Sequence, residues 1–269
     1  MTRFVRAQTR DLPALTALWQ TCFGDSAQSV KAFWDALFSK IQVFAAQDGA
    51  RLDAMLCALP VTFVDEDGDT QSAAYFYAVC TAPDKRGRGL CRALMQHAER
   101  ELQKGGISVF TLVPSSAELF DFYAKLGYQA AFYHDSYSVP AARGAVKIRR
   151  IDADAYRNLR QMQLYGDFLS YDAALLAFAQ HASEASGGGL FRLETAELVC
   201  CAAAERAGDT LLIKELLPDY PEAAADLAAA LNCSEAQVRT AGSAVPFGMC
   251  KTVGGQACPQ NAYLGLAFD

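Results

Sequence analysis

The stretch from Tyr75 to Arg92, YFYAVCTAPDKRGRGLCR, constrains the fold more than any other part of the chain. Aromatic and β-branched residues come first and predict a strand, which a turn at Pro83-Asp84 ends. The loop RGRG (Arg86–Gly89) comes next, and from Leu90 to Gln103 apolar residues recur with the period of a helix. A glycine-rich turn between a strand and a helix N-terminus brings main-chain amides close to a ligand. The sequence therefore predicts an anion site here, for a phosphate or pyrophosphate.

Length and composition favour a globular protein of one or two domains. The chain has 269 residues, 52% of them hydrophobic and 20% charged, and a net charge of −6. An acidic balance argues against a nucleic-acid-coating surface. No apolar run approaches the roughly 20 residues that span a bilayer, and the start MTRFVRAQTRDL lacks the apolar centre of a signal peptide. We expect a cytoplasmic protein that binds neither nucleic acid nor membrane, and a homo-oligomer stays open.

The cysteines and histidines do not predict a metal site. Nine cysteines form no CxxC pair, and most lie in apolar segments where a cysteine behaves as a small hydrophobic residue. His97, His134 and His181 are too far apart to show ligand spacing. The acidic turn from Asp65 to Asp69 lacks the later glutamate of a calcium loop, so we interpret it as a hairpin tip. Reduced thiols and no metal are expected.

The first half of the chain predicts an α/β fold with a mixed, mostly antiparallel sheet flanked by helices. We expect Asp11 to cap the first helix, which begins near it, and a second helix to follow. These two helices carry the aromatic residues Trp19, Phe33 and Trp34. Their helical spacing favours core packing over ligand contact. The expected strands are 3–8, 42–47, 51–64, the strand before the loop, 108–113, 128–131 and 133–139. The later helices are the one after the loop and one that begins at Ser116.

The second half repeats this order after a linker at Pro140–Gly144. A strand, two helices, three strands, a helix and further strands, including Ala262–Phe268, indicate a diverged duplication. We predict two domains, 1–140 and 145–269. The second strand-to-helix junction, Leu217–Ala223, has no glycine, two prolines and two acidic residues. The second copy is therefore not expected to hold the same ligand.

Two motifs resemble those of the GNAT superfamily of N-acetyltransferases. The family's loop, Gln/Arg-x-x-Gly-x-Gly/Ala after a strand, matches RGRGLC at 86–91, and its tyrosine motif is similar to FYAKLGY at 122–128. Cys91 stands where the family has glycine or alanine, and Ser116 where relatives often have asparagine. The order of elements extends the likeness to about residues 1–140. The chain as a whole is similar to tandem GNAT proteins with a degenerate second half.

The resemblance implies an N-acetyltransferase that uses acetyl-CoA as cosubstrate and a primary amine as acceptor. It places the pyrophosphate of coenzyme A on the loop and the pantetheine along the preceding strand, whose amides also stabilise the oxyanion. Ser116 occupies a further cofactor-contacting position. The residues implied in cofactor binding are Val79, Cys80, Thr81, Arg86, Gly87, Arg88, Gly89, Leu90, Cys91, Arg92 and Ser116.

The same motif position makes Tyr123 the acid that protonates the leaving thiolate. The base is not identified by the sequence, because the strand at 72–81 has no carboxylate. A water relay, Tyr75, Tyr77, Asp121 or the terminal Asp269 are the candidates for removing the proton of the substrate ammonium. Each side chain among them also has a structural interpretation.

Two alternatives to an N-acetyltransferase stay open. A non-catalytic acyl-CoA-binding or regulatory protein is consistent with Cys91, Ser116 and the missing carboxylate. A transferase with a different acyl donor is consistent with the resemblance, because tandem relatives also perform aminoacyl transfer.

Overall fold

The computed structural model describes residues 2–254 and 257–268, and Asp269 therefore lies outside the described residues. The chain divides into two compact units, each assembled from separate segments. The first consists of Met1–Phe63, Thr70–Gln129 and Met249–Cys258, and the second of Val64–Asp69, Ala130–Gly248 and Pro259–Asp269.

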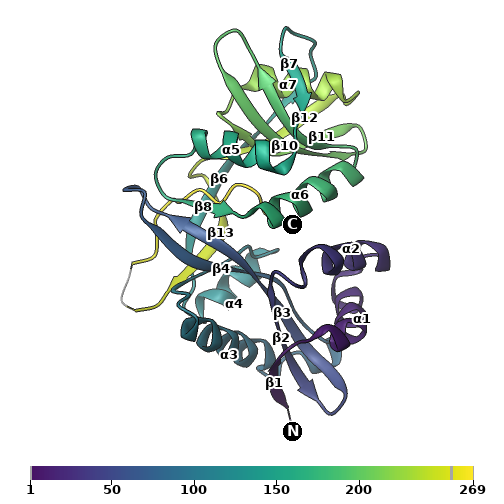
Figure 1. The fold of residues 1–269 in the computed structure, drawn as a ribbon, viewed down its shortest axis with the longest axis vertical. Helices are drawn as coiled ribbons and strands as arrows, with labels where there is room; N and C mark the ends of the chain where they lie inside the picture. Colours follow the sequence, from purple (N-terminus) through teal and green to yellow (C-terminus); the bar gives the residue numbers. More distant parts are fainter. Residues whose placement is uncertain (1, 255–256, 269) are drawn as a thin grey trace. The chain divides into compact units, whose positions relative to one another are not determined.

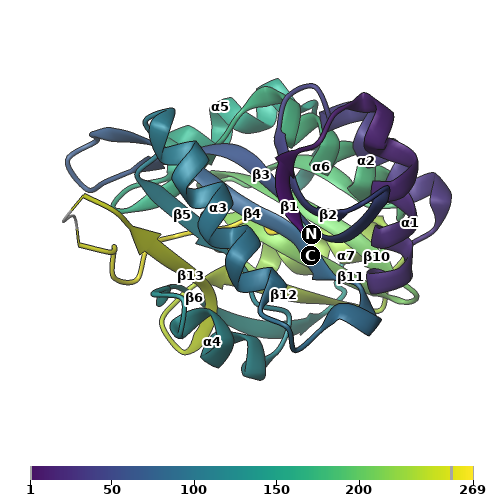
Figure 2. The same cartoon turned by 90° about the horizontal axis from the view of Figure 1, so that it is seen from below.

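The first unit is a mixed sheet with helices on both faces (Figures 1 and 2). Its strands have the order β1-β2-β3-β4-β5-β13, and β4 and β5 form the parallel pair. Pairs β1–β2, β2–β3 and β5–β13 are antiparallel. The elements are β1 (Arg3–Arg6), α1 (Leu12–Phe23), α2 (Ala27–Leu37), β2 (Gln42–Asp48), β3 (Arg51–Val64), β4 (Thr70–Thr81), α3 (Leu90–Lys104), β5 (Val109–Leu112), α4 (Ala117–Ala124) and the end of β13 (Val245–Thr252).

Alternation along β4 assigns its side chains to two different cores. Phe76 packs with α3 and α4, in a cluster that includes Leu94, Phe110 and Tyr128. Tyr77 faces the other way, where its ring lies 5.7 Å from that of Trp19 in α1. Trp19, Phe33 and Trp34 are 3%, 2% and 5% exposed, which confirms their prediction as core residues. The two helix pairs lie on opposite sides of the sheet, with α3 and α4 on one and α1 and α2 on the other (Figure 1).

From β7 to β12 the second unit repeats the order of elements from β1 to β5, with β8 added between the first two helices. Its strand order is β6-β12-β11-β10-β9-β7, in which β11–β12 is parallel and the remaining neighbours are antiparallel. Helix α7 packs its alanines and Leu227 against this sheet. The elements are β6 (Gln129–Pro140), β7 (Lys147–Arg150), α5 (Ala153–Gln163), β8 (Phe168–Tyr171), α6 (Ala173–Ala185), β9 (Gly189–Glu194), β10 (Val199–Ala207), β11 (Thr210–Leu217), α7 (Pro221–Ala230), β12 (Glu235–Ala241) and the start of β13.

The fold class is confirmed, and four local predictions are wrong. Residues 129–140 form one strand, β6, instead of two, and 262–268 form bridges only at Ala262 and Tyr263. Strand β8 was not predicted, whereas β12 and β13 were expected only as further strands without bounds. Asp11 precedes α1, but its carboxylate accepts the Gln8 amide at 2.8 Å and makes no side-chain cap to the helix. In the described part of the chain, no helix has both the length and the apolar character of a membrane span.

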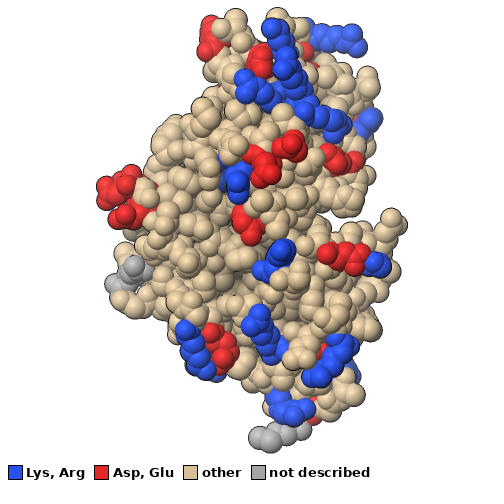
Figure 3. Space-filling model, in the orientation of Figure 1, with Lys and Arg blue, Asp and Glu red and all other residues tan. Residues whose placement is uncertain are grey.

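Charged side chains are distributed unevenly over the face drawn in Figure 3. Basic side chains gather over the part of the second unit that holds β7, whose sequence is KIRR, with acidic side chains beside them. Over the first unit, lysines and arginines alternate with acidic groups on this face.

Candidate functional site

The glycine loop of the first unit adopts a backbone that only glycine adopts readily. Gly87 and Gly89 have φ of +75° and +74°, in the left-handed region. A Cβ at either position would meet nothing within 4 Å, so the backbone conformation, and not crowding by the protein, requires glycine. Both are exposed. The loop is thereby open to an external group.

Helix α3 begins directly after this loop and directs its first amides out of the helix. Gly89 is the N-cap and provides no side-chain cap. The first hydrogen bond of the helix is donated by the Ala93 amide to the Gly89 carbonyl, at 3.0 Å. The amides of Leu90, Cys91 and Arg92 precede this bond and have no acceptor within the helix. Such an array, at the positive end of the helix dipole, favours an anion.

The three arginines of the loop are exposed but differ in their contacts. Arg86 folds back, and its Nε donates to the Thr81 carbonyl at 3.2 Å. Arg88 and Arg92 project from the loop and from the first turn of α3. Arg88 and Arg92 are therefore better placed than Arg86 to meet a phosphate.

Strand β4 continues past the end of its parallel partner β5, so that its last residues do not pair with β5. Residues 73–76 of β4 pair with 109–112 of β5, where β5 ends, whereas β4 runs on to Thr81. Ala78 lies in this continuation with φ of +49°, a rare conformation for alanine that bends the strand. Val79 is half-buried, and Cys80 and Thr81 are 8% and 9% exposed. Sequence reasoning found this strand edge but not the bend at Ala78, because a positive φ at alanine is imposed by tertiary structure.

Tyr123 of α4 lies close to the end of β4 and the start of α3. It is 6% exposed and packs in one cluster with Val79 of β4 and Cys91 of α3. Its ring makes edge contacts with Phe122 and Tyr128, at 5.2 and 6.1 Å between centroids. Burial, and secondarily the Cys91 thiol, raises the pKa of Tyr123 above its usual value. The hydroxyl therefore stays protonated at neutral pH and is a hydrogen-bond donor.

Ser116 and the candidate bases are placed less favourably. Ser116 is the exposed N-cap of α4, but its hydroxyl hydrogen-bonds to Glu118, whose pKa it lowers, instead of capping the helix. Tyr75 is 2% exposed, and Asp121 lies on the exposed side of α4. Tyr77 is half-buried between Trp19 and Phe33. Asp269 lies outside the described residues, so the structure gives no account of it.

A buried ion pair anchors the turn that carries the loop, and sequence reasoning missed it. Asp53 of β3 is 1% exposed and pairs with Arg51 at 2.9 Å and with Lys85 at 3.2 Å. Arg51 also pairs with Asp84. Because Asp84 and Lys85 belong to the turn before the loop, these contacts fix where the loop begins. A lone aspartate inside the apolar run LDAMLCAL was the available signal.

A pair of thiols flanks the end of β4. Cys22, at the end of α1, lies with its Sγ 3.6 Å from the Thr81 carbonyl oxygen and hydrogen-bonds with the Cys80 thiol. This hydrogen bond, assisted by the charge of Arg86 and opposed by partial burial, lowers the pKa of Cys22 to about 7. The pKa of Cys80 is raised by the same bond and by burial. The lowered pKa gives Cys22 more thiolate character than an ordinary cysteine has.

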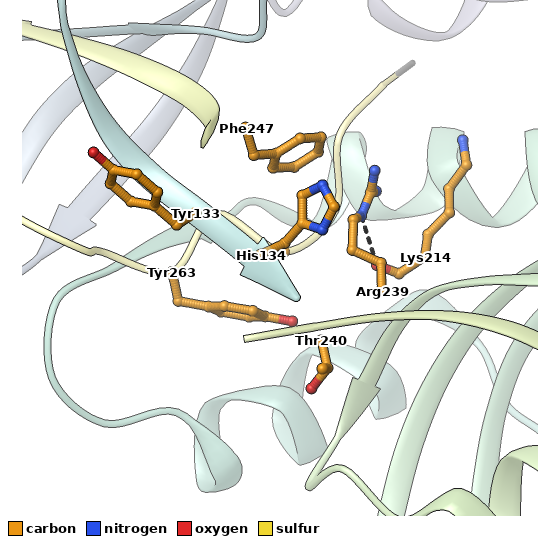
Figure 4. Close-up of a pocket in the computed structure, with 8 residues that line it drawn as sticks. Tyr133, His134, Lys214, Arg239, Thr240, Phe247 and Tyr263 are labelled. Atoms are coloured by element: carbon orange, nitrogen blue, oxygen red, sulfur yellow. Dashed lines mark hydrogen bonds between the residues drawn. The ribbon is translucent and has the colours of Figure 1, made fainter. Parts of the chain in front are cut away.

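The second unit contains a small pocket of its own beside the parallel pair β11–β12 (Figure 4). In Figure 4 the rings of Phe247 and Tyr263 lie on either side of the His134 imidazole, and Arg239 lies beside it. The lining residues are Tyr133, His134, Lys214, Arg239, Thr240, Phe247, Tyr263 and Gly265. Among the residues that the structure describes, no group of three or more His, Cys, Asp or Glu side chains could hold a metal ion.

Comparison with known proteins finds a family model that matches the first part of the chain. Residues 3–131 match a family model described as Acetyltransferase (GNAT) domain. No curated protein sequence matches the chain.

Solved structures resemble the chain over almost its whole length. A probable N-acyltransferase from Enterococcus faecalis is 17% identical, with 94% of this chain and 72% of that one covered and a TM-score of 0.74. A GCN5-related N-acetyltransferase from Anabaena variabilis is 17% identical, with 94% and 73% covered and a TM-score of 0.74. Another from Kribbella flavida is 16% identical, with 94% and 71% covered and a TM-score of 0.71. At such identities the likeness shows a shared fold, in the second half as well as in the first.

Proposed function

Because residues 3–131 match the model of a GNAT acetyltransferase domain, we propose that the protein is an N-acetyltransferase that transfers the acetyl group of acetyl-CoA to a primary amine of a small molecule or peptide. The observation that carries the proposal is the open RGRG loop at the start of α3, beside the end of β4 that has no β5 partner. We assign the acyl-CoA site to the domain 1–140, and 145–269 to a degenerate GNAT-like domain.

The loop suits the diphosphate end of the cosubstrate. The loop residues Gly87–Gly89 are exposed, the first amides of α3 follow them, and the charges of Arg88 and Arg92 add attraction for an anion. Arg86 acts indirectly, because its Nε fixes the Thr81 carbonyl at the entrance. Cys91 contributes its amide, while its half-buried Sγ lies 4.0 Å from the sulfur of Met95.

The bent end of β4 suits the pantetheine and the thioester. An extended amide chain can pair with a strand edge, and the edge at Val79–Thr81 extends past the end of β5. The bend at Ala78 turns the next amide out of the regular ladder. We assign that amide to the oxygen of the thioester, where negative charge develops as the amine attacks and the tetrahedral intermediate forms.

Tyr123 suits the leaving thiolate. Its pKa is raised above about 10, whereas a thiol titrates near about 8.5, so complete proton transfer to a thiolate is uphill. The hydroxyl instead stabilises the departing sulfur by donating a hydrogen bond. We assign no side chain as the base, since Tyr75 is buried and Asp121 is exposed on α4, and propose that water takes the ammonium proton.

Binding of acetyl-CoA is the first test. At 100 times its Kd, the cosubstrate should stabilise the protein by about 2.7 kcal/mol and raise the melting temperature by about 5–10 °C. The substitution Tyr123→Phe should leave this shift in place and lower kcat about tenfold to a hundredfold, with Tyr165→Phe, a 90%-exposed tyrosine, as the matched control. No thermal response of the wild-type protein to millimolar acetyl-CoA would refute the proposal.

A non-catalytic acyl-CoA-binding protein is the second candidate. The observation that favours it is the hydrogen bond between Ser116 and Glu118, because it directs the Ser116 hydroxyl, a predicted cofactor contact, toward its own helix. Tight binding of acetyl-CoA without release of free CoA across a panel of amines would support this candidate. Release only from a longer acyl-CoA would instead identify a different acyl donor.

A further inference from the structure

Two cysteines of the first unit, Cys22 and Cys80, come from elements that are packed against each other. Cys22 lies in the last turn of α1, three residues after Trp19 and on the same side of the helix. The Trp19 ring lies 5.7 Å from the ring of Tyr77 in β4, and Cys80 comes three residues after Tyr77. The Cys22 Sγ lies 3.6 Å from the carbonyl oxygen of Thr81, the residue after Cys80. The helix therefore follows the strand from the aromatic pair to the two cysteines.

The thiols of Cys22 and Cys80 face each other. A side-chain hydrogen bond joins them, in which the Cys80 thiol donates to the Cys22 sulfur. Both are free thiols in the structure. Cysteines whose side chains point apart cannot be bridged without movement of the backbone, whereas these two sulfur atoms already lie next to each other. The pair is therefore suited to form a disulfide.

The two cysteines differ in exposure and in the charge around them. Cys22 is half-buried and open to a small reagent, whereas Cys80 is 8% exposed. The hydrogen bond from Cys80 and the charge of Arg86 lower the pKa of Cys22 to about 7, so Cys22 is the nucleophile of the pair. Arg86 is held in place by the bond from its Nε to the Thr81 carbonyl, at 3.2 Å. The same thiol hydrogen bond, together with burial, raises the pKa of Cys80, which therefore stays protonated.

We propose that Cys22 and Cys80 form a thiol pair that hydrogen peroxide oxidises to a disulfide. In the first step the Cys22 thiolate attacks one oxygen of the peroxide, so that an S–O bond forms and the O–O bond breaks. The peroxide takes two electrons from the sulfur and leaves, with one proton, as water, and Cys22 becomes a sulfenic acid. In the second step the Cys80 sulfur attacks the Cys22 sulfur and the S–O bond breaks. The leaving hydroxide takes the Cys80 proton and forms a second molecule of water.

The disulfide would join the last turn of α1 to the end of β4, just before the turn that leads into the RGRG loop. This inference concerns thiol chemistry and does not depend on acetyl transfer.

Other half-buried cysteines of the chain provide comparisons. Cys91 lies 4.0 Å from the sulfur of Met95, a thioether that cannot form a disulfide, and burial raises the pKa of Cys91 to about 11. Cys258 hydrogen-bonds to the thiol of Cys250, which lowers the pKa of Cys258 to about 6. Because this second thiol pair could also react, the experiment has to identify which cysteines are joined.

Peptide mapping of the full chain after treatment with hydrogen peroxide tests the proposal. Remaining thiols are alkylated, and the protein is digested with trypsin and endoproteinase Asp-N. The second enzyme is needed because Cys57 and Cys80 share a tryptic peptide, which Asp-N divides at the acidic turn Asp65–Asp69. We expect a cross-linked peptide that contains Cys22 and Cys80 and separates on reduction with dithiothreitol. Oxidation of Cys91 should be about tenfold or more slower.

Two variants separate the steps of the reaction. Cys80→Ala removes the second thiol and should stop oxidation at the sulfenic acid, which dimedone then labels at Cys22. Cys22→Ser should give no cross-link to Cys80. The matched control is Cys91→Ser, which removes a half-buried thiol outside the pair and should leave the cross-link unchanged.

The readout on the wild-type protein does not require any variant to fold. Absence of the peptide that joins Cys22 to Cys80, or a cross-link from Cys22 to Cys57 in its place, would overturn the proposal. So would Cys80→Ala protein in which dimedone leaves Cys22 unlabelled.

Discussion

The two parallel strand pairs, β4–β5 and β11–β12, share a geometry and differ in the junction that connects each to its helix. Each pair has four matched residues on each strand, and each longer strand is distorted just beyond, at Ala78 in β4 and at Lys214 in β11. In the first unit the strand leads through RGRG into α3. In the second it leads through Leu217, Pro218 and Asp219 into α7, whose first residue is Pro221. The two units thus share the end of a parallel strand pair and differ in the junction that follows it.

The second junction is poorly suited to a diphosphate for several reasons. Pro221 at the first helical position has no amide proton, and Glu222 places a carboxylate in the first turn. Asp219 adds a second carboxylate, which accepts a hydrogen bond from the Tyr137 hydroxyl at 2.6 Å. Negative charge at the helix start disfavours a diphosphate there.

The second unit has a buried charged residue beside its parallel strand pair. Glu215, the residue after the Lys214 bulge, is fully buried and accepts hydrogen bonds from Arg160 and Tyr156. Arg160 also donates to the carbonyls of Leu169 and Leu264, at 2.9 and 3.4 Å. Gly265 must lack a side chain, because a Cβ there would lie 1.9 Å from the Glu215 carboxylate. The second unit therefore has a buried ionic cluster directly after its bulge.

The largest expected effect is on this ionic core. Arg160→Met removes one partner of a buried pair and leaves the Glu215 charge uncompensated, which should cost about 3–5 kcal/mol of unfolding free energy. Denaturant unfolding measures the change. The control is Lys31→Met, which removes an exposed i,i+4 pair with Asp35 and should cost less than about 1 kcal/mol. A loss for Arg160→Met no larger than the control would show that the core does not depend on the pair.

A smaller effect on stability, but a specific one on binding, is expected at the first junction. Gly89→Ala places a side chain at φ of +74° and should cost about 1–2 kcal/mol, while weakening acetyl-CoA binding at least tenfold by distorting the loop. The control Gly208→Ala has φ of +63° and equally open surroundings, in the turn between β10 and β11. It should lower stability similarly and leave acetyl-CoA binding intact. Equal weakening by both variants would mean that strain alone reduces binding.

The smallest expected effect is a difference in alkylation between one cysteine of each unit. Because its pKa is lowered to about 7, Cys22 is largely thiolate above that pH, and its alkylation by iodoacetamide should be half-maximal near pH 7. Burial raises the pKa of Cys200 to about 11, so this fully buried cysteine of β10 should stay unmodified up to pH 8. Peptide mapping by mass spectrometry monitors both sites, and Cys22→Ser should remove the first signal. Alkylation of Cys22 with a midpoint near pH 9 would contradict the assigned environment.

The sequence predicted those features that local patterns determine. The strand, the RGRG turn and α3 result from periodicity and glycine placement, and Tyr123 from its motif. The bend at Ala78 could not be predicted, since nothing in the residues around it favours a positive φ. The pairing of residues 249–252 with β5 could not be predicted either, because about 140 residues separate the partners and the pattern of one strand does not specify its neighbour.

In the candidate site, too, local patterns predict which residues of one segment belong together. Residues that are close in sequence, from Val79 to Arg92, were found together, whereas the contacts of Cys22 and Asp53 with this segment depend on how α1 and β3 pack. The contact of Ser116 with Glu118 depends on the rotamer of an exposed side chain. The base is still not assigned.

Calorimetric titration of the full chain with acetyl-CoA tests the central claim most directly, because it counts sites as well as detecting them. The account predicts one molecule of acetyl-CoA per chain, with binding reduced at least tenfold by Gly89→Ala and unchanged by Gly208→Ala. Two sites per chain, or binding unaffected by Gly89→Ala, would contradict the assignment of the cofactor to the first junction alone.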